Sequence, residues 1–130
     1  MIVVDASAVL EILLRTTAAA SVEARVFQRG QTLHVPHLID VEVAQVLRKY
    51  AATNRIDPQR CETALGDWLL FPVHRYAHDI LMPRVWALRA NVTAYDAVYI
   101  ALAEALDAPL ITRDRRLSGA PGHTARIELV

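Results

Sequence analysis

The first ten residues, Met1–Leu10, read MIVVDASAVL, and they indicate how the fold begins. Ile2–Val4 is an apolar run with strong strand preference, which is typical of a short buried strand. The run ends directly on Asp5, and Ser7–Leu14 has the pattern of a helix that Ser7 could cap. Asp5 is therefore either an N-cap or turn acid or the first part of a reaction centre. This stretch alone leaves both interpretations open.

Beyond this stretch, the chain alternates strand-like and helical segments. Strands are predicted within Thr32–Pro36, ended by Pro36, weakly within Phe71–Tyr76, and within Ala108–Thr112 and Arg126–Val130. Helices are predicted for Thr17–Gln28 (stopped by Gly30), His37–Ala51, Asp57–Leu70 (capped by Asp57), His78–Asn91 (kinked or delayed by Pro83) and Thr93–Leu106 (capped by Thr93), with turns over Arg113–His123. This alternation predicts an α/β fold whose parallel sheet is covered by helices on both faces.

Length and composition predict one globular domain over residues 1–130. The chain is long enough for one substantial core and too short for two comfortable ones, and 54% of its residues are hydrophobic. No Ser/Gly-rich linker, charge block or internal repeat divides it. We therefore expect a single domain.

The charged residues and the single cysteine limit the compartment and the partners. Fourteen basic and fourteen acidic side chains give a net charge of zero, so no overall field attracts a polyanion. All basic residues except Lys49 are arginine, which suits phosphate contacts but is also explained by the base composition of the coding DNA. Cys61 alone cannot form an internal disulfide, which fits a reducing cytoplasm. Asp5 and Glu11 interrupt the apolar N-terminus, so we expect neither a signal peptide nor a membrane span.

Four acids stand where a parallel sheet concentrates function, at the carboxyl ends of its strands. Asp5 and Asp114 each follow a predicted strand, although Asp114 is also a typical turn residue or a partner for a neighbouring arginine. Thr112 and Asp114 should project to the same side of the extended chain. Glu42 lies in a helix beside its apolar stripe, where a lone glutamate more often complements the helix dipole.

Asp96 is harder to explain by a purely structural role. Thr93 and Asp96 form a sequence similar to a capping box, although aspartate is shorter than the usual glutamate or glutamine. In the seven residues after Asp96, AVYIALA, the only polar side-chain group is the hydroxyl of Tyr99, so this helix should be buried on most faces. An ionised carboxylate at the start of a buried helix costs several kcal/mol unless it is paired, hydrogen-bonded or bound to metal.

Taken together, the four acids predict a metal site. Two of them end strands and two lie early on helices, so all four could converge at the carboxyl edge of the sheet. Carboxylates at such distances repel one another and raise one another's pKa values unless a cation neutralises them. A hard divalent ion such as Mg²⁺ or Mn²⁺ suits a site made only of oxygen ligands.

These residues resemble a known family. The segments IVVDASAVL, VTAYDAVYIALAEAL and PLITRD, with Glu42 in an early helix, resemble the PIN-domain ribonucleases, in particular the toxin components of VapBC-type toxin–antitoxin pairs. The resemblance covers essentially the whole chain, and TAYDAVYIALA followed by LITRDRRL is its most specific part. It implies a three-layer α/β/α domain with a central parallel sheet.

The resemblance also implies an activity, a metal site and partners. The expected activity is hydrolysis of RNA with one or two Mg²⁺ or Mn²⁺ ions, and the expected partner is an antitoxin, in a homodimer or an antitoxin-bound hetero-oligomer. By matching position, the metal and catalytic residues would be Asp5, Glu42, Asp96 and Asp114, with Ser7 and Thr112 orienting carboxylates or waters. Some members have another acid shortly after the last aspartate. Here Arg115, Arg116 and Leu117 follow, so the residues that would hold a second metal lack this acid.

Other readings of the residues rank lower. An aspartate-based phosphatase would need an acid two residues after Asp5, where Ser7 stands, and a phospho-receiver domain would need a late lysine. Zinc hydrolysis by His34 and His37 is disfavoured because they span a strand end and a proline, and the pair His74 and His78 lacks the metalloprotease glutamate. Cys61 has no evident base. A non-catalytic interaction module, whose acidic pocket takes a partner's arginine, is the remaining alternative; aromatic residues such as Trp68 and Trp86 could contribute to partner surfaces.

Overall fold

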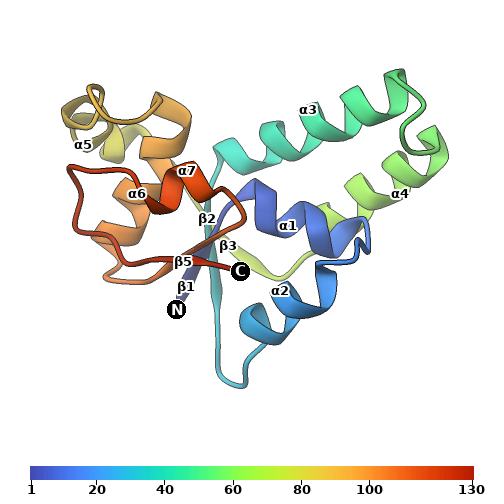
Figure 1. Ribbon diagram of the computed structural model, residues 1–130, viewed down its shortest axis with the longest axis horizontal. Helices are drawn as coiled ribbons and strands as arrows, with labels where there is room; N and C mark the ends of the chain where they lie inside the picture. The colour runs from blue at the N-terminus through green and yellow to red at the C-terminus, as the bar shows by residue number, and fades with distance from the viewer.

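The computed structural model describes residues 1–130 and contains five strands, seven α-helices and one 3₁₀ helix (Figure 1). The strands are β1 (Ile2–Val4), β2 (Leu33–Pro36), β3 (Val73–Tyr76), β4 (Leu110–Thr112) and β5 (Ile127–Leu129). The helices are α1 (Ala6–Leu13), α2 (Ala19–Val26), α3 (Leu38–Ala52), α4 (Pro58–Leu69), the 3₁₀ helix η1 (Asp79–Leu81), α5 (Met82–Ala87), α6 (Ala94–Ala105) and α7 (Arg115–Ser118).

The five strands form one parallel sheet in the order β3-β2-β1-β4-β5. In the central strand, Val3 pairs with His34 of β2 on one side and with Leu110 of β4 on the other. The chain thus moves from β1 to one side of the sheet and later continues on the other, so the strand order reverses between β1 and β4. The crevice at such a reversal is the usual ligand site of open parallel sheets.

Helices cover both faces of the sheet, as the three-layer prediction requires. Helices α1 to α4 lie on one side of the sheet, and α5 and α6 lie on the other (Figure 1). Helix α6 packs directly against β1, β2 and β4. The predicted α/β/α architecture with a central parallel sheet is confirmed.

The hydrophobic core is built around β1 and α6. All three residues of β1 are buried, and so are seven consecutive residues of α6, Ala97–Ala103. They belong to one cluster of 30 buried residues that also includes residues of α1 to α4. The apolar run after Asp96 therefore indicates burial correctly, and it places the amino end of α6 at the boundary between the core and the solvent.

Three local predictions need correction, and a fourth is confirmed. Asp5, not Ser7, caps α1, because its carboxylate accepts the amide hydrogen of Ala8. The strand predicted to end at Pro36 is confirmed, because Pro36 is the last residue of β2, where it pairs with Tyr76. The helix expected over residues 17–28 covers only Ala19–Val26. The stretch expected as turns contains α7, a short helix that the carboxylate of Asp114 caps.

The predicted effect of Pro83 is confirmed, because η1 precedes Pro83 and α5 begins only at Met82.

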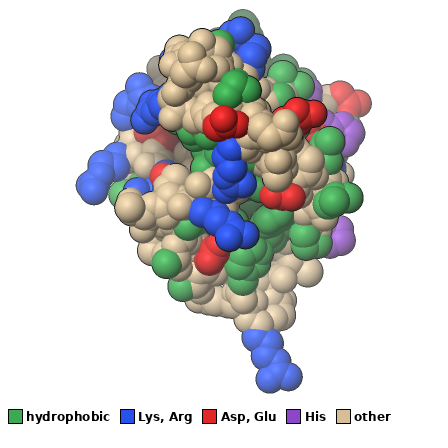
Figure 2. Space-filling view, turned by 90° about the vertical axis from the view of Figure 1, so that its right-hand side faces the viewer, with side chains coloured by type: hydrophobic (Ala, Val, Ile, Leu, Met, Phe, Trp, Pro, Cys, Tyr) green, Lys and Arg blue, Asp and Glu red, His purple; other side chains and the backbone are tan.

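The surface over α1 to α4 carries basic and acidic side chains interspersed with apolar ones, without one dominant charge (Figure 2). None of the helices combines the length and the apolar character that crossing a membrane requires.

Candidate active site

A cleft of about 1040 Å³ opens at the carboxyl edge of the sheet, beside the reversal between β1 and β4. The four acids singled out from the sequence line it together with Ser7; they are Asp5, Glu42, Asp96 and Asp114. They come from the end of β1, from α3, from α6 and from the end of β4. The fold therefore brings together residues that are up to 109 positions apart in the sequence.

Asp5 is buried, with 6% of its surface exposed, and both of its carboxylate oxygens accept hydrogen bonds. Oδ1 accepts from the Ser7 hydroxyl at 2.6 Å and from the Ala8 amide at 3.0 Å, and Oδ2 accepts from the Thr112 hydroxyl. Burial raises the pKa of Asp5 and the charge of Asp114 adds to this rise, while the three hydrogen bonds oppose it. The residue is thus both the cap of α1 and a fixed acid of the cleft.

Thr112 joins the two strand ends. It is fully buried, donates to Asp5, and accepts the amide hydrogen of Asp114 at 2.9 Å. The Ser7 hydroxyl oxygen in turn accepts the amide hydrogen of Arg113 at 2.9 Å. The two hydroxyl residues predicted to support the acids therefore hold the ends of β1 and β4 in fixed register.

Asp114 faces the cleft from the amino end of α7. Its carboxylate accepts the amide hydrogen of Arg116 at 2.8 Å and pairs loosely with the Arg116 guanidinium at 3.5 Å. Partial burial acts to raise the pKa of Asp114, but the hydrogen bonds and the charge of Arg116 outweigh burial and lower it. Asp114 therefore carries its negative charge readily.

Glu42 reaches the cleft from α3, which lies on the opposite side of the sheet from α6 (Figure 1). Its Oε2 accepts a hydrogen bond from the hydroxyl of Tyr99, a residue of α6. Burial raises the pKa of Glu42, the Tyr99 hydrogen bond lowers it, and the charges of Asp5 and Asp96 raise it further. Three carboxylates from three elements are thus close enough to perturb one another.

Among the four acids, Asp96 is the one whose carboxylate has no partner in the surrounding structure. Its amide donates to the Thr93 hydroxyl at 3.2 Å, which completes one half of the capping box suggested by the sequence. The other half does not form, because the Asp96 carboxylate takes part in no hydrogen bond or ion pair within the chain. Helix capping therefore explains Thr93 but leaves the Asp96 carboxylate without a structural role.

The donor set of the cleft suits a hard divalent cation. It consists of four carboxylates and two hydroxyls, and oxygen ligands of this kind are those that Mg²⁺ and Mn²⁺ prefer. In their present positions, no three of these carboxylates lie close enough together to hold a metal ion between them. Glu42 is hydrogen-bonded to Tyr99 through Oε2 alone, and Asp114 accepts its one short hydrogen bond, from the Arg116 amide, through Oδ1, so each keeps an oxygen for an ion.

The histidines do not form a comparable site. His34 is buried in β2, and both of its ring nitrogens are engaged, one with the Thr32 hydroxyl and one with the Tyr76 hydroxyl. Its ring stacks on that of His74 at 4.8 Å between centroids. His34 is therefore a structural residue, and this argues against the zinc alternative. Cys61 is buried in α4, which argues against a nucleophile.

Sequence reasoning gave no site role to two residues that border the acids, Tyr99 and Glu11. Tyr99 donates to Glu42, and Glu11 lines the cleft and pairs with Arg113 at 3.4 Å. Tyr99 carries the only side-chain polar group of an apolar helix and lies three positions after Asp96, which places both on one helical face. Glu11 lies four positions after Ser7, which places it on the same face of α1. These two spacings are the features of the sequence from which a position at the cleft could have been predicted.

The comparison with known protein families identifies the fold family. The description of the PIN domain matches residues 2–122 of this chain. The chain belongs to the PIN-domain family. Ribonuclease VapC9 of Mycobacterium tuberculosis is 47% identical over 118 residues, which are 91% of this chain and 89% of that protein. Ribonuclease VapC12 of the same species is 42% identical over 130 residues, which are 100% of this chain and 99% of that protein.

The solved structures agree on the fold. The structure of VapBC2 from Rickettsia felis, bound to a DNA fragment from its promoter, matches with a TM-score of 0.73 at 12% sequence identity. The match covers 100% of this chain and 99% of that one. At this identity, the similarity supports the PIN-like architecture alone. VapC ribonucleases with a PIN domain are generally dependent on a divalent metal.

Proposed function

We propose that this PIN-domain protein is a divalent-metal-dependent endoribonuclease that acts as the toxin of a toxin–antitoxin pair. The observation that carries the proposal is the convergence of four acidic side chains from four elements on one cleft at the carboxyl edge of the sheet. Relatives that are 42–47% identical and bear the name ribonuclease support the choice of substrate. We further propose that residues 1–130 form a single domain and that the protein is cytoplasmic.

The cleft residues take distinct roles in this reaction. Asp5, Asp96 and Asp114 would hold Mg²⁺ or Mn²⁺, with Glu42 acting directly or through water. A bound ion would supply activation of a water for attack on the phosphodiester and neutralisation of charge on the phosphoryl oxygens. Ser7 and Thr112 keep the Asp5 oxygens oriented. The expected products carry 5′-phosphate and 3′-hydroxyl ends.

Arginines at the rim would hold the RNA against an acidic floor. Arg113 lines the cleft, and Arg116 borders a second hollow of about 670 Å³ that Asp96 also lines. The side chain of Arg116 is 92% exposed, so its guanidinium is accessible to a phosphate. Arg115, next to it, is exposed as well. The two hollows meet at Asp96, so a strand could pass over the acids with phosphates bound on both sides.

An antitoxin is the proposed protein partner, because the wall of the cleft away from the acids is apolar. The apolar residues of this wall come mainly from α1 and α3; they include Leu10, Leu14, Leu38, Val41 and Val46. A partner segment with apolar side chains could lie along this wall and place a basic side chain among the acids. We expect a homodimer or an antitoxin-bound hetero-oligomer. The non-catalytic alternative would use the same cleft for binding alone.

The test compares the wild-type protein with the Asp5→Asn variant on a panel of RNAs in Mg²⁺, in Mn²⁺ and with a chelator. Asparagine is also a good N-cap, so the variant should keep α1. We expect metal-dependent cleavage by the wild type only. Equal cleavage by both proteins would refute the nuclease site, and antitoxin binding without any cleavage would support the binding module.

A further inference from the structure

Tyr99 is a buried tyrosine whose hydroxyl serves the cleft. Only 2% of its surface is exposed, and its neighbours on α6 are the apolar residues Val98 and Ile100. The ring could pack equally well as phenylalanine, because the rest of this helical segment contributes only apolar side chains to the core. A buried hydroxyl needs a hydrogen-bond partner, and the partner here is Oε2 of Glu42.

Glu42 depends on this hydroxyl for its position. The Tyr99 hydroxyl is the one hydrogen-bond donor that reaches its carboxylate, and no arginine, lysine or histidine pairs with it. A glutamate side chain has three rotatable bonds, so its placement without a partner costs conformational entropy. Since Oε2 is engaged, Oε1 remains without a hydrogen bond on a residue that lines the cleft.

The contact also joins the two helical layers at the acids. Glu42 belongs to α3, whereas Tyr99 belongs to α6, on the opposite side of the sheet. Tyr99 lies one helical turn after Asp96, so the hydroxyl fixes Glu42 relative to the acid in the first turn of α6. The position of one cleft carboxylate is therefore set by the helix that carries another.

We propose that Tyr99 is a positioning residue of the metal site, whose hydroxyl holds Glu42 at the cleft so that its carboxylate can share an ion with Asp5 and Asp96. This inference rests on the proposed metal-dependent function. Tyr99 itself touches neither the ion nor the RNA. Its effect passes through Glu42, and it appears first in metal affinity and only as a consequence in cleavage.

The experiment measures Mn²⁺ binding by calorimetry in the wild type and in the Tyr99→Phe variant. Removal of a group that orients a metal ligand commonly weakens metal affinity by about 10–100-fold, and we expect about tenfold here. Cleavage at saturating Mn²⁺ should return close to the wild-type rate. The matched control is Tyr76→Phe, which removes a tyrosine hydroxyl that bonds to His34 at 2.7 Å outside the cleft. This control should leave Mn²⁺ affinity unchanged.

The same substitution in a Glu42→Ala background separates a positioning role from a general loss of stability. If Tyr99 acts through Glu42, Tyr99→Phe has no further effect on Mn²⁺ affinity once Glu42 is absent. Additive losses, or unchanged Mn²⁺ affinity in the folded Tyr99→Phe single variant, would overturn the inference. If the wild type bound no Mn²⁺, the proposed metal site would fall as well, so the two failures are distinguishable.

Discussion

Glu42 and Glu104 are glutamates of the same chain, yet they lie in opposite electrostatic surroundings. Glu104, near the carboxyl end of α6, accepts from the Arg84 guanidinium at 2.7 and 2.9 Å, and this pairing lowers its pKa to about 2. Glu42, in the cleft, has no basic partner, and burial raises its pKa. Glu104, which helps to hold the fold together, is paired with an arginine, whereas Glu42 in the cleft has no positively charged partner.

The same difference extends to the arginines. Away from the cleft, Arg25 pairs with Glu128 at 2.6 Å and Arg84 with Glu104 at 2.7 Å. At the cleft, the Arg116–Asp114 distance is 3.5 Å. Short, partly buried pairs stabilise a fold, whereas long, exposed ones contribute little. Glu42, Asp96 and Arg116 therefore have weaker partners within the chain than Glu104 and Arg84 have, which leaves them available for a cation and a phosphate.

The largest effect on stability is expected from Glu104→Gln. This variant keeps the shape of the side chain but loses the charge-assisted bonds to Arg84, so we expect the free energy of unfolding at pH 7 to fall by about 1–3 kcal/mol. Urea denaturation of the wild type and the variant measures this difference in the free energy of unfolding. The control is Asp107→Asn, which breaks the exposed pair with Arg126 and should change stability by less than about 0.5 kcal/mol.

The pH dependence of this difference sharpens the same test. Because the pKa of Glu104 is about 2 in the folded protein, its contribution is fully present above the unfolded value of about 4.3. It is lost as the pH falls through the folded value. The wild type and Glu104→Gln should therefore converge in stability between pH 4.5 and about 2. A constant difference over this window would mean that the charge of Glu104 is not what stabilises the fold.

A smaller effect of opposite sign is expected from Glu42→Gln. Removing one negative charge from the neighbourhood of Asp5 and Asp96 relieves repulsion, so the metal-free variant should be more stable at pH 7 by about 0.5–1 kcal/mol. The amide oxygen can still accept from Tyr99. Thermal unfolding in the presence of a chelator measures this change in stability. A clear loss of stability would mean that Glu42, like Glu104, stabilises the fold.

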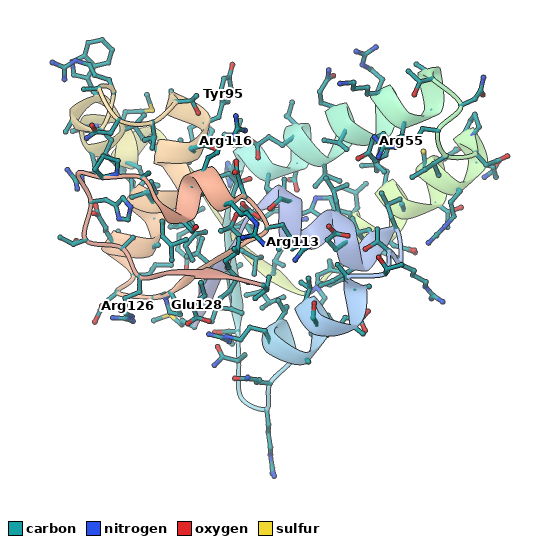
Figure 3. The ribbon with its side chains drawn as sticks, in the orientation of Figure 1. Arg55, Tyr95, Arg113, Arg116, Arg126 and Glu128 are labelled. Carbon is teal, nitrogen blue, oxygen red and sulfur yellow. The ribbon has the colours of Figure 1, made fainter.

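The smallest effect is expected from Arg116→Ala, measured as the salt dependence of RNA binding in the Asp5→Asn background. If Arg116 binds one phosphate, the slope of log affinity against log salt should become less steep by about 1. The control is Arg126→Ala, because Arg126 pairs with Asp107 and lines neither hollow; in Figure 3 it lies below Arg116, at the lower left. Equal slopes in both variants would remove Arg116 from the RNA path.

The sequence predicts most of the sheet and the four acids, because each depends on local signals. The apolar runs of β1 and β4 are fully buried, and the acids that follow them stand at strand ends in the structure. The bond between Tyr99 and Glu42 could not be predicted, since it depends on how α3 and α6 pack across the sheet. Helix α7 was missed because four residues give no periodicity and its start rests on the Asp114 cap.

The most direct test of the central claim is RNA cleavage by the Asp96→Asn variant in saturating Mn²⁺. The Asp96 carboxylate makes no hydrogen bond or ion pair within the chain, so its loss should leave the thermal stability near that of the wild type. If the four acids form a metal-dependent nuclease site, cleavage should fall by at least about 100-fold in this folded variant. Cleavage at the wild-type rate would contradict that account.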